Sequence, residues 1–132
     1  MTITGECFCG SVKYQINGEL GEGRSCHCSR CRKLTSAQAS AYAEVSPGTF
    51  EWTSREDLLT TYYSGEGFGH QFCGRCGSTL CGIHEGHGHG IMLGCVNGDP
   101  RVKIGMHIYV GSKAPWEVIP KGVRQFEEGP VD

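Results

Sequence analysis

The sequence predicts a mainly β protein built from short antiparallel strands, and three observations support this fold class. Polar and apolar residues alternate with a period of two in most readable segments. Glycine contributes 21 of 132 residues, about twice its usual share, and supplies many turns. No window of a dozen residues shows the apolar spacing of a helix, so we expect at most a short helical turn after Cys31.

Each expected strand follows from its own pattern of residues. The first has Val12, Tyr14 and Ile16 alternating with polar neighbours, and the second carries alanines along one face. Turn signals separate the others, notably at 47–48, 64–67 and 97–100. The expected strands lie at 11–16, 37–45, 50–52, 58–64, 68–72, 90–96 and 105–110.

Length and charge limit the class of protein. We expect one domain spanning residues 1–132, which is long enough to bury a core. The net charge of −2 gives no electrostatic footprint for nucleic acid. The N-terminus resembles no signal peptide, and no apolar run could cross a membrane. A cytoplasmic, soluble protein of undefined oligomeric state is therefore expected.

The nine cysteines favour metal binding over disulfide formation. Their number is odd, and seven of them form tight groups that are too closely spaced for ordinary disulfide partners. Such spacing is typical of metal ligands in a reducing compartment. The three groups are Cys7-x-Cys9, Cys26-x-Cys28-x-x-Cys31 and Cys73-x-x-Cys76.

Two of these groups predict a closed, structural zinc site. Cys7, Cys9, Cys73 and Cys76 provide the four ligands of a tetrahedral ion, and a glycine follows each pair. Glycine tolerates the positive φ of the tight turn that directs backbone N–H groups at the thiolates. The alternative is a set of buried, metal-free cysteines, since cysteine is among the most buried residue types.

Cys26, Cys28 and Cys31 predict a second zinc ion with an open coordination position. Three protein ligands and an exchangeable fourth are typical of catalytic zinc. One alternative is that a further side chain closes the site; another is that the triplet is a metal-free redox group. The candidate fourth ligands are His27, Cys81, Cys95, His84, His87 and His89.

Several other residues have simpler interpretations. We expect the histidine-rich segment 84–89 to be a glycine-rich loop, and His70 to be packed or hydrogen-bonded. Cys81 and Cys95 fall in strand-like segments, where they would act as small apolar residues. A cluster of basic residues is suited to a small anion; it contains Arg24, Arg30, Arg32 and Lys33.

Four motifs, in this order, resemble the glutathione-dependent formaldehyde-activating enzyme family, which also includes centromere protein V. They are Gly5-Glu-Cys7-Phe-Cys9-Gly10-Ser-Val12, Cys26-His-Cys28-Ser-Arg-Cys31-Arg-Lys33, Phe72-Cys73-Gly-Arg-Cys76-Gly77-Ser and His107-Ile-Tyr-Val-Gly-Ser112-Lys113-Ala-Pro-Trp116. Family members usually have glycine where this chain has Ser36. In the last motif, we expect Trp116 to pack against the sheet.

The resemblance implies a zinc-containing β-tent domain like that of Rab-binding exchange-factor chaperones. It also implies two zinc ions: a structural one on the paired cysteines and a second one on the triplet near the glutathione site. The implied reaction is that of a carbon–sulfur lyase in reverse, which joins glutathione to formaldehyde as S-hydroxymethylglutathione. Arg30, Arg32 and Lys33 are candidate contacts for the glutathione carboxylates; no general acid is assigned.

A non-catalytic alternative remains open at this point. The related chaperones use the same architecture to hold protein partners, so the chain could be a zinc-stabilised binding module. An enzyme predicts a metal with an exchangeable ligand, whereas a binding module predicts saturated ions and an exposed apolar patch. A chromatin role is disfavoured by the acidic balance and the absence of a basic tail.

Overall fold

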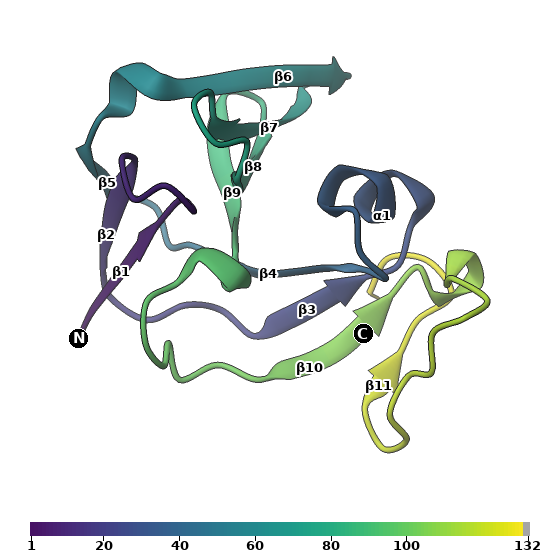
Figure 1. The fold of residues 1–132 in the computed structure, drawn as a ribbon. Helices are drawn as coiled ribbons and strands as arrows, with labels where there is room; N and C mark the ends of the chain where they lie inside the picture. Colours follow the sequence, from purple (N-terminus) through teal and green to yellow (C-terminus); the bar gives the residue numbers. More distant parts are fainter. Residues whose placement is uncertain (131–132) are drawn as a thin grey trace. The chain divides into compact units, whose positions relative to one another are not determined.

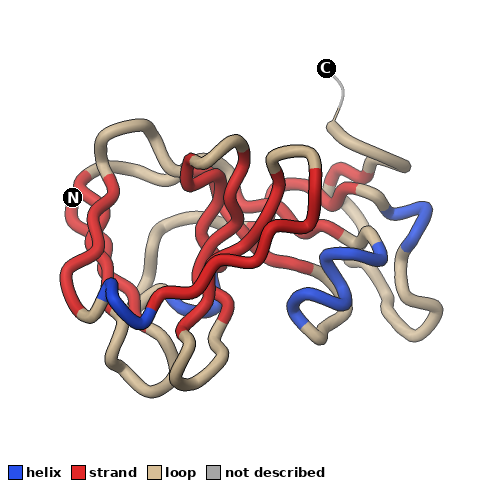
Figure 2. The backbone as a smooth tube through the Cα atoms, turned by 90° about the horizontal axis from the view of Figure 1, so that it is seen from above, coloured by secondary structure: helices blue, strands red, loops and turns tan. Residues whose placement is uncertain are grey.

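A computed structural model describes residues 1–130, with the side chains of residues 87–89 left aside. The chain forms two compact units. Unit 1 contains residues 1–21 and 43–102, and unit 2 contains residues 22–42 and those from Lys103 onward. Figure 2 shows that strands dominate and that the helices are short, which confirms the predicted mainly β class.

One sheet of unit 1 brings the N-terminal segment against the middle of the chain. It has the order β1-β2-β5, and both pairs are antiparallel. Gly5 lies opposite Tyr14, whose buried ring stacks on Phe50 and meets Trp52 edge-on. The strands are β1 (Thr2–Glu6), β2 (Lys13–Asn17) and β5 (Phe50–Ser54).

The other strands of unit 1 form an antiparallel series of hairpins, labelled in Figure 1. A short 3-10 helix, η1 (Glu56–Leu58), leads into this series, and η2 (Leu93–Cys95) follows it. Gly67 has a φ of 79° and permits the turn of the first hairpin. The strands are β6 (Leu59–Gly65), β7 (Phe68–Cys73), β8 (Thr79–His84) and β9 (His87–Met92).

The core of unit 1 combines aliphatic side chains with cysteines. Cys7 and Cys73 are buried within it, so one cysteine of each of these two pairs belongs to the core. Leu58, Val96 and Cys95 pack against its margin. The buried members are Ile3, Cys7, Val12, Tyr14, Ile16, Cys73, Leu80, Cys81 and Ile91.

Unit 2 places its strands in the order β11-β10-β3-β4. β10 (Ile104–Ile108) runs parallel to β3 (Gly23–Cys26) and to β11 (Arg124–Gln125). The β3–β4 pair is antiparallel, and β4 (Ser40–Glu44) crosses from unit 2 into unit 1. A separate core of Cys26, Met106 and Ile108 fills this unit.

Helix α1 (Ser29–Thr35) follows β3 after two residues and ends at Ser36. Ser36 has a φ of 54°, in the left-handed region, and its N–H bonds to the Arg32 carbonyl. This is the C-terminal cap geometry that glycine adopts most readily. Ser36 therefore adopts this left-handed cap with some backbone strain.

Several strand boundaries differ from the sequence-based expectation. The strand expected at 37–45 begins only at Ser40, because residues 37–39 form a bend that is bonded back to the helix through Ala37 N–H to the Arg32 carbonyl and Thr35 Oγ to the Ala39 carbonyl. The strand expected at 90–96 ends at Met92, and a hydrogen bond from Val96 N to the Leu93 carbonyl closes a 3-10 turn. Cys95 is therefore helical, whereas Cys81 is in a strand as expected.

Two further expectations were wrong. Residues 84–89 are not a loop: His84 ends β8, residue 87 begins β9, and Glu85-Gly86 forms the turn of their hairpin. Trp116 does not pack against the sheet but is 69% exposed. Strand β10 ends just before Tyr109, which has a φ of 55°, so the segment that carries Trp116 does not continue the strand. No helix of the described chain is long and apolar enough to cross a membrane.

We expect Gly5→Ala to destabilise the protein by about 1–3 kcal/mol, because an added methyl group would overlap with the Tyr14 ring. Gly94→Ala is the matched control, since its methyl group would enter open space. Urea unfolding with both variants saturated with zinc measures the difference. Equal stabilities would contradict the packing described for β1 and β2.

Candidate metal centres

The first candidate centre gathers Cys7, Cys9, Cys73 and Cys76. Their sulfur atoms all lie within 4.8 Å of one another. The Cys7–Cys9 and Cys9–Cys73 sulfurs are 3.6 and 3.9 Å apart. A tetrahedron with Zn–S bonds of about 2.3 Å has edges of about 3.8 Å, so this donor set fits zinc. None of the nine cysteines forms a disulfide.

Two equivalent backbone turns create this arrangement. In each, the first cysteine N–H bonds to the carbonyl five residues later: Cys7 to Val12, and Cys73 to Ser78. Backbone N–H groups of Val12 and Arg75 donate to the Cys7 and Cys73 sulfurs, at 3.3 and 3.4 Å. The glycines that follow the pairs, Gly10 and Gly77, have φ values of 77° and 83°. Both motifs therefore have the tight turns that were expected around a bound ion.

The thiols of the first centre differ in acidity. Burial raises the pKa of Cys7 to about 11. Burial opposes ionisation of Cys76 too, but hydrogen bonds from Ser78, the Cys9 backbone and the Cys73 thiol together outweigh it and lower the pKa of Cys76 to about 5. Hydrogen bonds from Ser11 likewise lower the pKa of Cys9. Since metal binding requires thiolates, the bound ion must displace the remaining thiol protons.

The second candidate centre lies where β3 passes into α1 in unit 2. Cys26 ends β3, Cys28 is the N-cap of the helix, and Cys31 is in its first turn. The Cys31 N–H donates to the Cys28 sulfur at 3.3 Å. The three sulfurs lie within 4.8 Å of one another, so they too could hold a metal ion.

A hydrogen bond couples two thiols of the triplet. The bond from Cys31 lowers the pKa of Cys26 to about 6. The same bond, together with burial, raises the pKa of Cys31 well above the usual thiol range. A metal ion bound to both sulfurs would have to displace the Cys31 proton.

Among the described side chains, no fourth ligand joins the triplet group. His27 is engaged elsewhere, as shown below. The Cys81 thiol donates to Gln71 Oε1 at 3.2 Å, and the Cys95 sulfur is 3.6 Å from the Thr79 carbonyl. His84 stacks on Phe68 with ring centroids 4.2 Å apart. The candidates His87 and His89 lie outside the described side chains.

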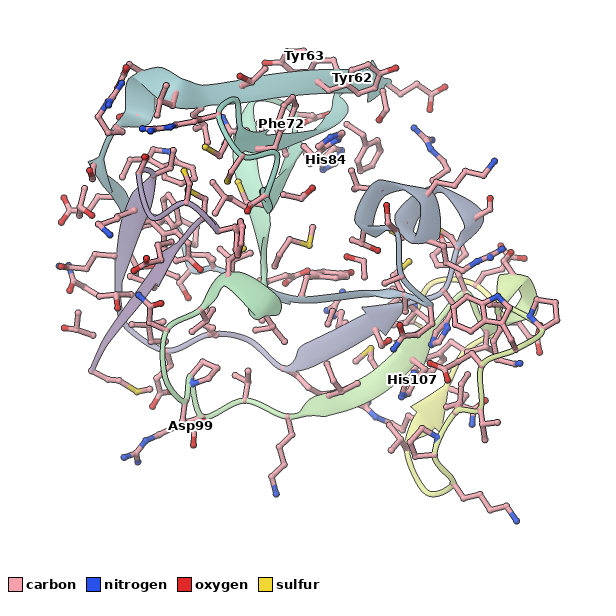
Figure 3. The ribbon with its side chains drawn as sticks, viewed as in Figure 1. Tyr62, Tyr63, Phe72, His84, Asp99 and His107 are labelled. Carbon is pink, nitrogen blue, oxygen red and sulfur yellow. The ribbon has the colours of Figure 1, made fainter. Side chains whose placement is uncertain are left out.

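His27 forms a buried imidazole pair with His107 of β10, which is labelled in Figure 3. His27 Nε2 and His107 Nδ1 are 2.8 Å apart, and Ser25 Oγ lies 3.5 Å from His27 Nε2. Burial lowers the pKa of both histidines, so a neutral donor–acceptor pair is favoured at pH 7. The pair ties the residue between Cys26 and Cys28 to a strand 80 residues later.

The predicted anion contacts lie on α1, next to the triplet. Arg30 and Lys33 are exposed, whereas Arg32 is half-buried. The Arg32 Nε atom is buried and has no hydrogen-bond partner among the described residues. Its charge also contributes to lowering the pKa of His27, which places it near that ring. Arg32 is therefore the most suitable of the three for an incoming carboxylate.

Other residues of the motifs have local roles. The Lys113 ammonium donates to the carbonyls of Ala114 and Glu117, at 3.0 and 2.7 Å, and so holds the turn after η3 (Val110–Ser112). His70 lies between the rings of Tyr62 and Phe72, as expected for a packed histidine.

One pair of side chains beside the triplet was not predicted from the sequence. The Arg24 guanidinium hydrogen-bonds to the Tyr42 hydroxyl, and Tyr42 packs against the core that contains Cys26. No strand was expected at 23–26, whereas β3 occupies these residues and places Arg24 and Cys26 on one face. The pairing of β3 with β4, which brings Tyr42 to that face, has no local signal in the sequence.

Comparisons with known proteins agree with this arrangement. The family model described as glutathione-dependent formaldehyde-activating enzyme matches residues 2–112. A crystal structure of a Rhodobacter sphaeroides protein has a TM-score of 0.62 and 20% sequence identity. The similarity covers 93% of this chain and 98% of that chain, and at this identity it shows the fold alone. No curated protein matches the chain.

We expect Cys73→Ser to lose one zinc equivalent, because it removes a ligand of the first centre. Structural zinc contributes several kcal/mol to folding, so Tm should fall by about 10 °C or more. Cys81→Ala is the control, since its buried thiol belongs to neither group. Elemental analysis and thermal unfolding measure both effects. Equal zinc contents in the two variants would refute the assignment.

Proposed function

Because this chain belongs to the glutathione-dependent formaldehyde-activating enzyme family, we propose that it catalyses addition of a thiol to a small aldehyde. Glutathione or a related thiol is the nucleophile, and formaldehyde or another small electrophile accepts it. The product with formaldehyde is S-hydroxymethylglutathione, so the enzyme acts as a carbon–sulfur lyase in reverse. The clustered thiols require a reducing compartment, for which we propose the cytoplasm.

One observation supports this function most directly. The triplet offers three sulfurs and no fourth ligand among the described side chains, whereas the other group offers four. We propose that the four-cysteine group binds structural zinc and that Cys26, Cys28 and Cys31 hold a second zinc with an exchangeable position. When bound there, zinc favours the thiolate form of an incoming thiol and makes it nucleophilic at neutral pH.

The protein's own residues position the reactants. We propose that Arg32, with Arg30 and Lys33, binds the two carboxylates of glutathione and orients its sulfur toward the triplet. The His27–His107 bond holds the segment between Cys26 and Cys28 against β10. Holding two reactants in line converts a bimolecular step into an effectively unimolecular one, which supplies much of the acceleration.

A second candidate function, a zinc-stabilised binding module, has one observation in its favour. Tyr62, Tyr63 and Phe68 are 59%, 63% and 44% exposed along the β6–β7 hairpin, where Figure 3 labels the two tyrosines. Exposed aromatic groups of this kind occur at protein interaction surfaces. The family match and the three-ligand centre favour the enzyme as the first proposal.

The zinc-loaded protein should accelerate the exchange of glutathione with formaldehyde, measured by NMR exchange spectroscopy at mildly acidic pH. Few glutathione molecules are ionised there, so the uncatalysed reaction is slow. We expect Cys31→Ser to lower the catalysed rate by at least about 100-fold, since it removes a ligand of the second centre.

Cys81→Ala should retain the parental rate and serves as the control. No acceleration by the parent protein would refute the formaldehyde assignment. Equal activity of parent and Cys31→Ser would refute the role of the triplet instead. Saturated zinc at both centres together with tight binding of a protein ligand would favour the binding module.

We expect Arg32→Gln to raise the Kd of glutathione by about tenfold, because a charge-assisted bond to a carboxylate contributes about 1.5–3 kcal/mol. Lys33→Gln removes an exposed, more strongly screened charge of the same proposed site and should raise the Kd less, by about two- to threefold. Isothermal titration calorimetry at two salt concentrations measures both. Equal effects of the two variants would show that only the net charge of α1 matters.

A further inference from the structure

The pairing of β3 with β4 and β10 shows which side chains of unit 2 share a face of the sheet. Directly opposite residues of paired strands share a face; Arg24 lies opposite Tyr42, and Cys26 lies opposite Ser40. Ser25 and His107 are also opposite each other, on the other face of β3. The triplet thiol Cys26 therefore shares its face with Tyr42 and Arg24, while the histidine pair lies on the reverse side.

Tyr42 is close to the thiols on that shared face. Cys26 and Tyr42 are diagonal neighbours, a separation of roughly 7–8 Å between Cα atoms that an aromatic side chain can span. Tyr42, Cys28 and Cys31 all pack against the cluster of Cys26, Met106 and Ile108. The phenol thus adjoins the place where a sulfur nucleophile would be held.

Arg24 fixes the orientation of the phenol. A guanidinium has donors but no acceptor, so the Tyr42 oxygen accepts the hydrogen bond from Arg24. The Tyr42 O–H must therefore point away from Arg24. A phenol ordinarily ionises only near pH 10, so the hydroxyl has a proton to donate at neutral pH.

We propose that Tyr42 is a catalytic residue whose hydroxyl donates a hydrogen bond to the aldehyde oxygen, and that Arg24 is its positioning residue. This inference rests on the proposed function and names the group that stabilises the developing negative charge. His27 and His107 are less suited to this role, because their register places them on the opposite face of β3. Tyr42 shares the face of Cys26.

The step balances without an oxidant or reductant. The thiol gives its proton to solvent, and a sulfur electron pair forms the new carbon–sulfur bond. The carbonyl π bond breaks, and its electron pair moves to oxygen, where the Tyr42 O–H stabilises the charge. A proton from solvent completes the hydroxyl group. In the reverse direction, the same hydrogen bond stabilises the oxygen as the carbon–sulfur bond breaks.

Tyr42→Phe tests this role while preserving the packed ring. Removing one donor to an oxyanion typically costs about 10²–10³ in kcat for acyl transfer, and for this easier reaction we expect a loss of about 10–100-fold. The KM for the thiol and the zinc content should stay within about twofold of the parent values. Tyr63→Phe, which removes an exposed hydroxyl from β6, is the matched control.

A binding measurement provides a readout independent of turnover. S-methylglutathione carries the carbon but lacks the oxygen, so its affinity should be the same for parent and Tyr42→Phe. The equilibrated glutathione–formaldehyde adduct, titrated by calorimetry against a glutathione-only control, should bind about tenfold more weakly to Tyr42→Phe. Thermal unfolding confirms that the variant is folded.

The possible results distinguish a failure of the Tyr42 role from a failure of the proposed function. An active parent with an equally active Tyr42→Phe variant would overturn the inference and leave the proposed function intact. Equal weakening of adduct and S-methylglutathione binding would also overturn it, because Tyr42 would then shape the thiol site. A parent that does not accelerate the reaction would refute the proposed function, and this inference would fall with it.

Discussion

The close approach of thiol groups is the constraint on which the structure of unit 1 depends. Cys9 and Cys73 are separated by 64 residues, yet their sulfurs are 3.9 Å apart. Two backbone turns of matching geometry hold these sulfurs, and both turns need a left-handed glycine. Because Cys7 and Cys73 are also buried core residues, the ligand cluster and the hydrophobic core stabilise the same part of the fold.

In unit 2 the site is organised by strand β3. Its successive side chains point to opposite faces of the sheet and therefore have different roles. One face carries Arg24 and Cys26, beside Tyr42. The other directs His27 toward His107 of β10. The histidine bond thereby fixes the backbone between two thiol ligands without occupying a ligand position. The bond thus steadies the segment that carries the three clustered sulfurs.

The two centres differ in a way that suits different roles. The four-cysteine group satisfies tetrahedral zinc by itself, and its thiols are embedded in the core or in turns that support it. The triplet lies at a strand–helix junction, next to basic side chains and to a tyrosine held by arginine. Family membership and this asymmetry support the same proposal, in which one ion stabilises and the other participates in thiol chemistry.

The sequence by itself determined the mainly β class, the grouping of cysteines and the turns that their glycines permit, because these depend on local periodicity and spacing. Local patterns did not predict the secondary structure correctly where contacts with another segment of the chain determine it. The alternation at 37–45 suggested one strand, but residues 37–39 form a bend that is hydrogen-bonded to helix α1, so the strand begins at Ser40. The glycine-rich composition of residues 84–89 suggested a loop, but the pairing of β8 with β9 makes them part of a hairpin. The pairs His27–His107 and Arg24–Tyr42 arise only when distant strands adopt a register, and that register is set by tertiary packing across long sequence separations.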